Sequence, residues 1–169
     1  IEEARQALVS KIGENMNVRR FVRLNAQGQV ASYRHGVKIG VIVDIVDGNV
    51  ELGKDVAMHV AATNPMCVSE EQVPQEALDK EKDIFVAQAK ESGKPDNIIE
   101  KMVTGRMKKY LAEITLVGQS FVKDPDQTVG KLLGSANASV ASFTRFEVGE
   151  GIEKKKEDFA AEVMAQVKG

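Results

Sequence analysis

The longest hydrophobic pattern in the chain covers residues 30–46. Over its second half, β-branched residues occupy alternate positions: Val37, Ile39, Val41, Val43 and Ile45. A period of two with β-branched side chains on one face predicts a half-buried strand. Ile42 and Val46 make the other face partly apolar as well, so we expect this strand at the centre of a sheet.

A glycine divides this pattern and marks the first functional candidate. Gly36 predicts a bend or a bulge in the strand, and Tyr33, Arg34 and His35 directly precede it. A rigid strand would hold these polar groups out at the bend. We predict that His35 is exposed there and contacts a partner, and a purely structural role for its ring is the alternative.

Two more strands complete the predicted sheet. Residues 18–25 place Val22 and Leu24 on one face, and residues 140–148 form the third strand. The turn-forming residues 25–29 predict a hairpin between the first of these strands and the central one. We therefore expect an α+β fold with a small antiparallel three-stranded sheet packed with helices.

Apolar residues spaced three or four apart predict helices before, between and after these strands. One helix ends near Gly13, and another covers residues 52–63. Asp126 or Thr128 would cap a short helix, since both side chains accept hydrogen bonds from free backbone N–H groups. A C-terminal helix is expected from residue 152 onward.

The middle of the chain predicts a helical hairpin. Residues 75–92 are rich in helix-forming residues, and apolar residues at helical spacing continue to Ile114. The sequence Gly93-Lys94-Pro95 ends one helix and begins the next, so the two helices run antiparallel and project from the sheet. Their apolar stripe needs cover, either from a second copy of the chain or from the core.

Composition narrows the classes of partner. Lys and Arg number 23 and Asp and Glu 25, for a net charge of −2. This balance predicts neither nucleic-acid nor membrane binding. The single cysteine, Cys67, suits a reducing compartment, so we expect a cytoplasmic protein. The sequence has no apolar run long enough to cross a bilayer, and its first residue, Ile1, suggests a processed product or a fragment.

The candidate motifs for chemistry are weak. Residues 48–55 match a phosphate-binding loop up to the last position, where Asp55 replaces the Ser or Thr that would hold magnesium. His59 lies on an apolar helix face and is more typical of a satisfied core residue than of a ligand. Two distant histidines and one cysteine predict no metal site and no nucleophile–base pair. The residues favour an interaction protein without a cofactor over an enzyme.

Several stretches resemble a known family. The bacterial elongation factor Ts family has similar motifs in the same order: Lys11–Arg20 (KIGENMNVRR), Tyr33–Gly36 (YRHG), Ala57–Ala62 (AMHVAA), Gly105–Lys109 (GRMKK) and Arg145–Gly151 (RFEVGEG). The similarity covers essentially all 169 residues and corresponds to the C-terminal part of the family. It implies a division into the end of a first core subdomain (1–17), a second core subdomain in two parts (18–67 and 117–151), a dimerisation hairpin (68–116) and a C-terminal helical module (152–169).

The resemblance also implies a function and a set of contact residues. The family is the guanine nucleotide exchange factor of elongation factor Tu, and it acts by binding that GTPase, without chemistry of its own. Self-association would involve the hairpin. The implied partner-binding residues are Ile12, Gly13, Glu14, Asn15, His35 and Val122 toward the C-terminal barrel domain of elongation factor Tu, and Phe159, Val163 and Met164 in the helix that packs on its nucleotide-binding domain.

The sequence departs from the family pattern in two respects: it does not include the N-terminal helical module of the family, and it lacks one motif. A Thr-Asp-Phe-Val motif intrudes beside the magnesium site in the family, and this sequence contains no Thr-Asp-Phe. We therefore expect docking onto elongation factor Tu rather than full exchange activity. Two alternatives remain open at this stage: a dimeric scaffold built on the hairpin, and a small phosphate-handling enzyme that uses residues 48–55.

Overall fold

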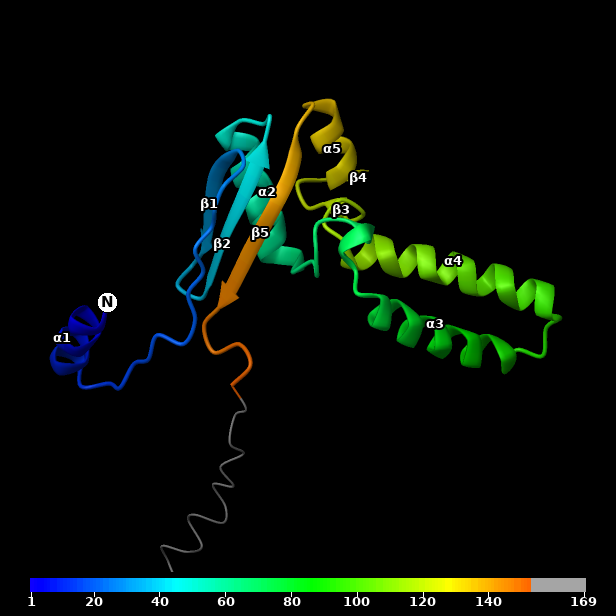
Figure 1. Ribbon diagram of the computed structural model, residues 1–169, viewed down its shortest axis with the longest axis horizontal. Helices are drawn as coiled ribbons and strands as arrows, with labels where there is room; N and C mark the ends of the chain where they lie inside the picture. The colour runs from blue at the N-terminus through cyan, green and yellow to red at the C-terminus, as the bar shows by residue number, and fades with distance from the viewer. Residues whose placement is uncertain (153–169) are drawn as a thin grey trace, which may run out of the picture.

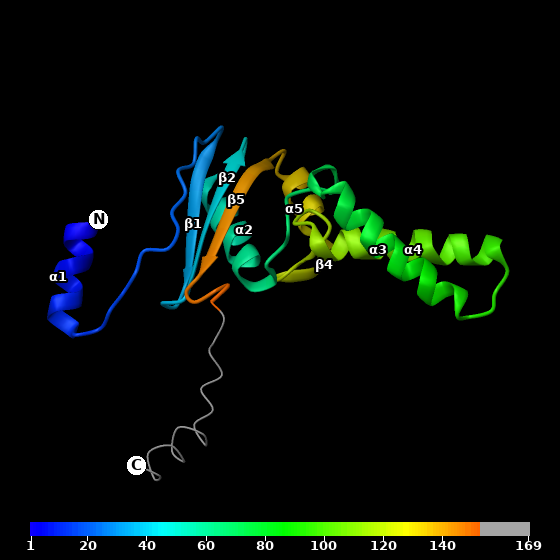
Figure 2. The same cartoon turned by 60° about the horizontal axis from the view of Figure 1, so that its bottom comes forward.

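A three-stranded antiparallel sheet and one helix form the centre of the molecule in the computed structural model, which describes residues 1–152 (Figure 1). The strands are β1 (Gln29–His35), β2 (Ile39–Val46) and β5 (Ser139–Glu147), with β2 in the middle. Helix α2 (Val50–Thr63) covers one face of the sheet (Figure 2). The α+β fold class and the central position of the alternating segment are both confirmed.

The main core lies between this sheet and α2. The β2 residues Val41, Val43 and Ile45 face the buried α2 residues Val56 and Val60. Gly53 permits the close approach, because a Cβ there would lie 2.5 Å from the Cβ of Ala31 on β1. Asn49 caps α2 by accepting a hydrogen bond from the Leu52 N–H at 2.8 Å, as its residue type favours.

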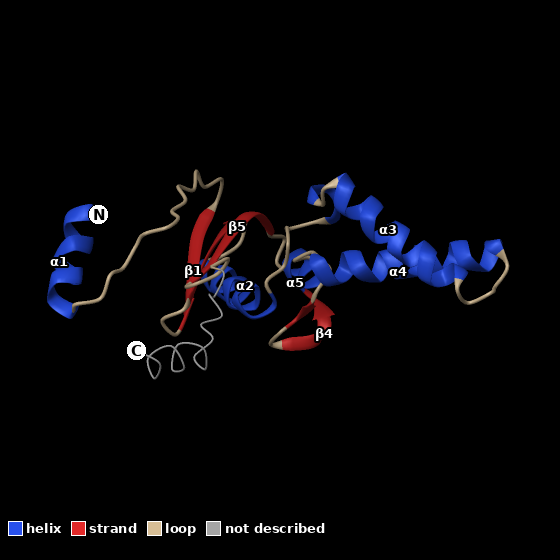
Figure 3. Cartoon of the chain, turned by 90° about the horizontal axis from the view of Figure 1, so that it is seen from below, coloured by secondary structure: helices blue, strands red, loops and turns tan. Residues whose placement is uncertain are grey.

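The remaining elements stand around this centre (Figures 1 and 3). Helix α1 (Glu2–Ile12) buries none of its residues and stands apart from the sheet. A short 3-10 helix (Glu70–Gln72) precedes a helical hairpin of α3 (Gln75–Lys90) and α4 (Asp96–Ile114). A small two-stranded sheet, β3 (Ser120–Phe121) and β4 (Asp124–Thr128), leads into helix α5 (Val129–Ser135), which Thr128 caps as one of the two predicted choices.

The predicted hairpin of helices is confirmed. Helices α3 and α4 pack on each other and project away from the sheet (Figure 2). Ala89, Ile99 and Val103 are buried between them, with Phe85, Val86 and Met107 packed around. The two helices thus bury much of their apolar stripe against each other, and they do so without folding back along the core.

Two strand predictions were wrong. Residues 18–25 form an extended loop, not a strand, so the predicted hairpin at residues 25–29 is absent. Side-chain contacts hold this loop instead of a strand ladder, as described below. The pattern over residues 30–46 is two strands, not one bent strand: Gly36 has φ +57° and turns the chain back into a β-hairpin. Val37 therefore lies in the turn and is 90% exposed.

Candidate partner-binding surface

The end of α1 presents the first group of predicted contact residues. Gly13 adopts φ +75°, and its N–H donates to the Val9 carbonyl at 2.9 Å. This left-handed residue ends the helix sharply, because glycine enters that conformation without a Cβ clash. The four predicted residues of this turn are all exposed: Ile12, Gly13, Glu14 and Asn15. Arg5 steadies the turn by donating to the Met16 carbonyl at 2.8 Å.

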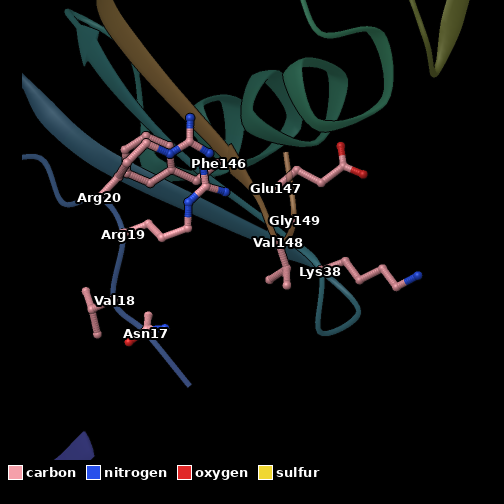
Figure 4. A pocket seen from close by; sticks show the side chains of 9 residues that line it. All are labelled: Asn17, Val18, Arg19, Arg20, Lys38, Phe146, Glu147, Val148 and Gly149. Carbon is pink, nitrogen blue, oxygen red and sulfur yellow. The ribbon is translucent and has the colours of Figure 1, made fainter. Parts of the chain in front are cut away.

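Two arginines then tie the loop after α1 to the end of the sheet (Figure 4). Arg19 donates to the Glu150 carbonyl at 2.8 Å, and Arg20 donates to a Glu150 carboxylate oxygen at 3.0 Å. The Arg20 guanidinium also lies 4.8 Å from the ring centre of Phe146. The Arg20 hydrogen bond lowers the pKa of the Glu150 carboxyl. Arg19 and Arg20 line a pocket of about 270 Å³ between the loop and the end of the sheet. Both arginines hold the loop in place through these contacts.

His35 stands at the tip of the β1–β2 hairpin, as predicted. The ring is exposed, and its Nδ1 lies 3.3 Å from the Tyr33 hydroxyl. Beside it is a cavity of about 530 Å³ between the sheet and the second half of α2. Its lining combines apolar and charged side chains: Tyr33, His35, Ile39, Met58, Ala61, Ala62, Arg145 and Glu147.

The floor of this cavity is held by a buried cation. The Arg145 side chain is only 9% exposed and donates to the Glu147 carboxylate at 2.7 Å. Its Nε also donates to the Ala61 carbonyl near the end of α2, at 3.4 Å. Because Arg145 bonds to both the strand and the helix, it fixes the end of α2 against β5 and so supports the surface beside His35.

Val122 lies at the turn between β3 and β4, on the other side of α2. Its side chain is 40% exposed, while its N–H donates to His59 Nδ1 at 3.2 Å. His59 itself is fully buried, and its Nε2 lies 2.9 Å from Gln119 Oε1. The prediction of a satisfied core histidine is confirmed. The second half of α2 therefore supports both the His35 cavity, through Met58 and Ala61, and the Val122 turn.

The phosphate-loop pattern has a structural explanation. Its residues form the cap and first turns of α2, where Asn49 accepts the Leu52 N–H. Lys54 lies 3.8 Å from Glu51 in an exposed pair, and Asp55 pairs with Lys123 of the β3–β4 turn. The Lys54 cation that a phosphate site would use is thus close to a carboxylate, and Asp55 would repel a phosphate at the position where a hydroxyl is needed.

Three further properties of residues 1–152 bear on function: metal binding, membrane spanning and thiol reactivity. The part of the chain described here contains no group of three or more His, Cys, Asp and Glu side chains that could hold a metal ion. Among the helices of the same residues, none is long and apolar enough to cross a membrane. Burial raises the pKa of the Cys67 thiol, which disfavours the reactive thiolate.

Sequence reasoning missed two residues that position this surface. Asp44, 1% exposed, accepts the N–H groups of Gln27 and Gly28 at 2.7 and 2.9 Å and so fixes the end of the loop that starts at α1. Arg145 is the other. A charged residue within an apolar strand pattern is the signal in both cases, because a buried charge needs partners. The predicted residues Phe159, Val163 and Met164 and the helix that carries them lie outside the described residues.

The fold is an α+β module on which the predicted contact residues His35 and Val122 are exposed. The family model "Elongation factor TS" matches residues 1–150. This chain therefore belongs to the elongation factor Ts family, and the resemblance drawn from its motifs is confirmed.

Individual relatives agree with the family match. The chain is 66% identical over 171 residues to elongation factor Ts of Thioalkalivibrio sulfidiphilus, covering 100% of this chain. It is 63% identical over 169 residues to that of Methylococcus capsulatus and 60% identical over 167 residues to that of Nitrosomonas eutropha, each covering 99% of this chain. The chain spans 57–58% of the length of these relatives.

Proposed function

We propose that this chain docks onto elongation factor Tu carrying GDP and contributes to the release of GDP, without full exchange activity of its own, so that GTP can replace GDP during translation elongation. Family membership supports the proposal. The observation that carries it is that the matched contact residues Ile12–Asn15, His35 and Val122 are exposed. His35 stands on the β1–β2 hairpin and Val122 on a turn bonded to α2, while the loop that follows Asn15 is tied to the end of the sheet through Arg19.

Such a function needs no covalent step by the chain. An exchange factor that weakens GDP binding by a given ratio must itself be bound more weakly by the same ratio when GDP is present. The chain can shift the GTPase only by its different affinity for the two states. A surface of exposed contact residues on a rigid support is suited to this role, because little ordering entropy is lost on docking.

The contact residues divide between two parts of the GTPase. We assign Ile12, Gly13, Glu14, Asn15, His35 and Val122 to the C-terminal barrel domain of elongation factor Tu. Phe159, Val163 and Met164 are assigned to its nucleotide-binding domain. We assign self-association to the α3–α4 hairpin, where Ile84 and Ile98 remain 40% and 38% exposed. We also propose the division that the family resemblance implies, into segments 1–17, 18–67, 68–116, 117–151 and 152–169.

Two calorimetric titrations test the proposal. The chain is titrated into elongation factor Tu that is free of nucleotide and into the same protein loaded with GDP. We expect binding in both cases and tighter binding to the nucleotide-free form, because linkage requires it. Equal affinities would reduce the chain to an anchor without exchange activity. No binding by the folded chain to either form would contradict the proposed partner.

A further inference from the structure

The two ring nitrogens of His59 take opposite roles in the core. Val122 N–H donates to Nδ1 at 3.2 Å, so Nδ1 is an acceptor and carries no proton. The proton of the neutral ring is then on Nε2, which donates to Gln119 Oε1 at 2.9 Å. Phe121 covers the ring at a centroid distance of 5.9 Å. The geometry thus defines one tautomer of a fully buried imidazole.

Gln119 extends this network to two more elements. Its Oε1 also lies 2.9 Å from the Thr63 hydroxyl, whose single hydrogen is shared with the His59 carbonyl at 2.9 Å, and its Nε2 donates to the Glu113 carbonyl at the end of α4 at 2.7 Å. The side-chain amide is therefore oriented by three partners. His59 is held on one side by this fixed amide, so its other nitrogen has a fixed position toward the β3–β4 turn.

Two other contacts support the turn: the Phe121 side chain beside it is buried in the main core, and Lys123 forms an ion pair. Lys123 pairs with Asp55 of α2, but both side chains are partly exposed, at 49% and 32%. An exposed ion pair of this kind fixes position weakly. The bond from Val122 to His59 is, by contrast, shielded from water by Phe121 and α2. It is the hydrogen bond by which the Val122 backbone is joined to α2, beside the packing of Phe121.

We propose that His59 is a positioning residue for partner binding: its unprotonated Nδ1 holds the Val122 backbone so that the exposed Val122 side chain meets elongation factor Tu. This inference rests on the proposed function for the role of Val122 at the interface. It goes beyond that function by assigning the task of orientation to a buried residue that never touches the partner.

Two substitutions separate positioning from simple filling of the core. In His59→Asn, the side-chain oxygen occupies the place of Nδ1 and can still accept the Val122 N–H. In His59→Gln, the amide reaches the place of Nε2, so the contact with Gln119 is retained and the acceptor for Val122 is lost. Both variants are polar and of similar size, so each is the control for the other.

The first readout needs no partner. Amide hydrogen exchange is measured at Val122 and at Val60, a buried residue of the same helix. We expect His59→Gln to accelerate exchange at Val122 and leave Val60 unchanged, and His59→Asn to preserve protection at both. Equal acceleration at both amides in both variants would show a general packing role and overturn the proposal. Unchanged exchange at Val122 in His59→Gln would overturn it as well.

The second readout is affinity for nucleotide-free elongation factor Tu. We expect His59→Gln to weaken binding about tenfold and His59→Asn to stay within about threefold of the unmodified chain, since one oriented hydrogen bond is at stake. Equal affinity for all three proteins would overturn the proposal. If the unmodified chain does not bind, the proposed function fails by itself, while exchange at Val122 still decides whether His59 holds the turn.

Discussion

The sheet–α2 core and the α3–α4 hairpin bury apolar residues in different ways. The core joins β2, α2, β5 and the segments around Leu116 and Phe121 into one cluster of side chains distant in sequence. The hairpin has a small cluster of three buried residues, Ala89, Ile99 and Val103, all within its own two helices. The core also encloses Asp44 and His59, each with hydrogen-bond partners. The core therefore links many more elements than the hairpin does.

The connection between the two regions is narrow. Met66 N–H donates to the Ile114 carbonyl at 2.8 Å, and Leu116 N–H donates to the Cys67 carbonyl at 2.9 Å. These backbone bonds join the two ends of the hairpin where it leaves the core. We therefore expect damage in the hairpin to stay local, whereas damage in the core should displace the contact residues.

Two matched isoleucine substitutions give the largest expected difference. Ile45 is fully buried in the core and Ile99 is 9% exposed in the hairpin. Ile45→Ala should lower the free energy of unfolding by about 3 to 4 kcal/mol, and Ile99→Ala by about 2 kcal/mol. Urea denaturation measures both values. Hydrogen exchange should show Ile99→Ala opening only α3 and α4, and acceleration in β2 by that variant would refute the separation of the two regions.

Asp44→Ala should have the next largest effect. It removes the acceptor of the Gln27 and Gly28 N–H groups in a buried place, and unsatisfied donors of this kind cost about 2 kcal/mol. Asp83→Ala on the exposed face of α3 is the control, with a change of less than about 0.5 kcal/mol. Thermal unfolding compares them. Similar small losses in both variants would show that Asp44 does not hold the loop.

Mild acid should act on the core and spare the hairpin. Burial lowers the pKa of His59 from the ordinary value of 6.5, and the Gln119 hydrogen bond offsets this in part. The unfolded chain then binds the proton first, so the contribution of neutral His59 is complete above pH 6.5 and is lost as the pH falls through the folded-state pKa. The protection factor at Val122, which is corrected for the pH dependence of intrinsic amide exchange, should fall as the pH is lowered below 6.5, while α3 and α4, which contain no histidine, should change less. The His59→Asn variant should lack this pH response at Val122, and an identical response would assign it to another group.

The smallest effect is expected in the former phosphate-loop pattern. Lys54 is exposed and its pair with Glu51 is long, so Lys54→Ala should change the free energy of unfolding by less than about 0.5 kcal/mol. Added GTP or GDP should leave the melting temperature of the chain alone unchanged. A rise in melting temperature with nucleotide that Lys54→Ala abolishes would revive the enzyme alternative.

Local periodicity predicted most of the fold. The helical hairpin, α2, the cap at Thr128 and the central strand all follow from spacing and capping residues that act within a few positions. The predicted strand over residues 18–25 was wrong. Apolar and polar residues alternate there as in a strand, but a strand also needs a neighbouring strand to pair with. Arg19 and Arg20 bind Glu150, far along the chain, and no local signal shows such a pairing.

Some features of the candidate site were also predictable from local sequence, and others were not. Exposure of His35 followed from the glycine beside it, and burial of His59 from its apolar helix face. The bond between His59 and Val122 joins residues 63 positions apart, so periodicity could not predict it. The candidate contact residues were predicted from motifs, whereas the hydrogen-bond partners of His59, Asp44 and Arg145 were seen only in the structure.

One comparison of affinities tests most directly whether the core, and not the hairpin, docks onto elongation factor Tu. Binding to nucleotide-free elongation factor Tu is measured for His35→Ala at the sheet tip and for Ile84→Ala, an exposed apolar residue of α3. We predict that His35→Ala weakens binding more than about tenfold, as for a central contact residue, with an unchanged circular dichroism spectrum. Ile84→Ala should bind like the unmodified chain. Full affinity in His35→Ala together with a loss in Ile84→Ala would contradict the account and place the contact on the hairpin.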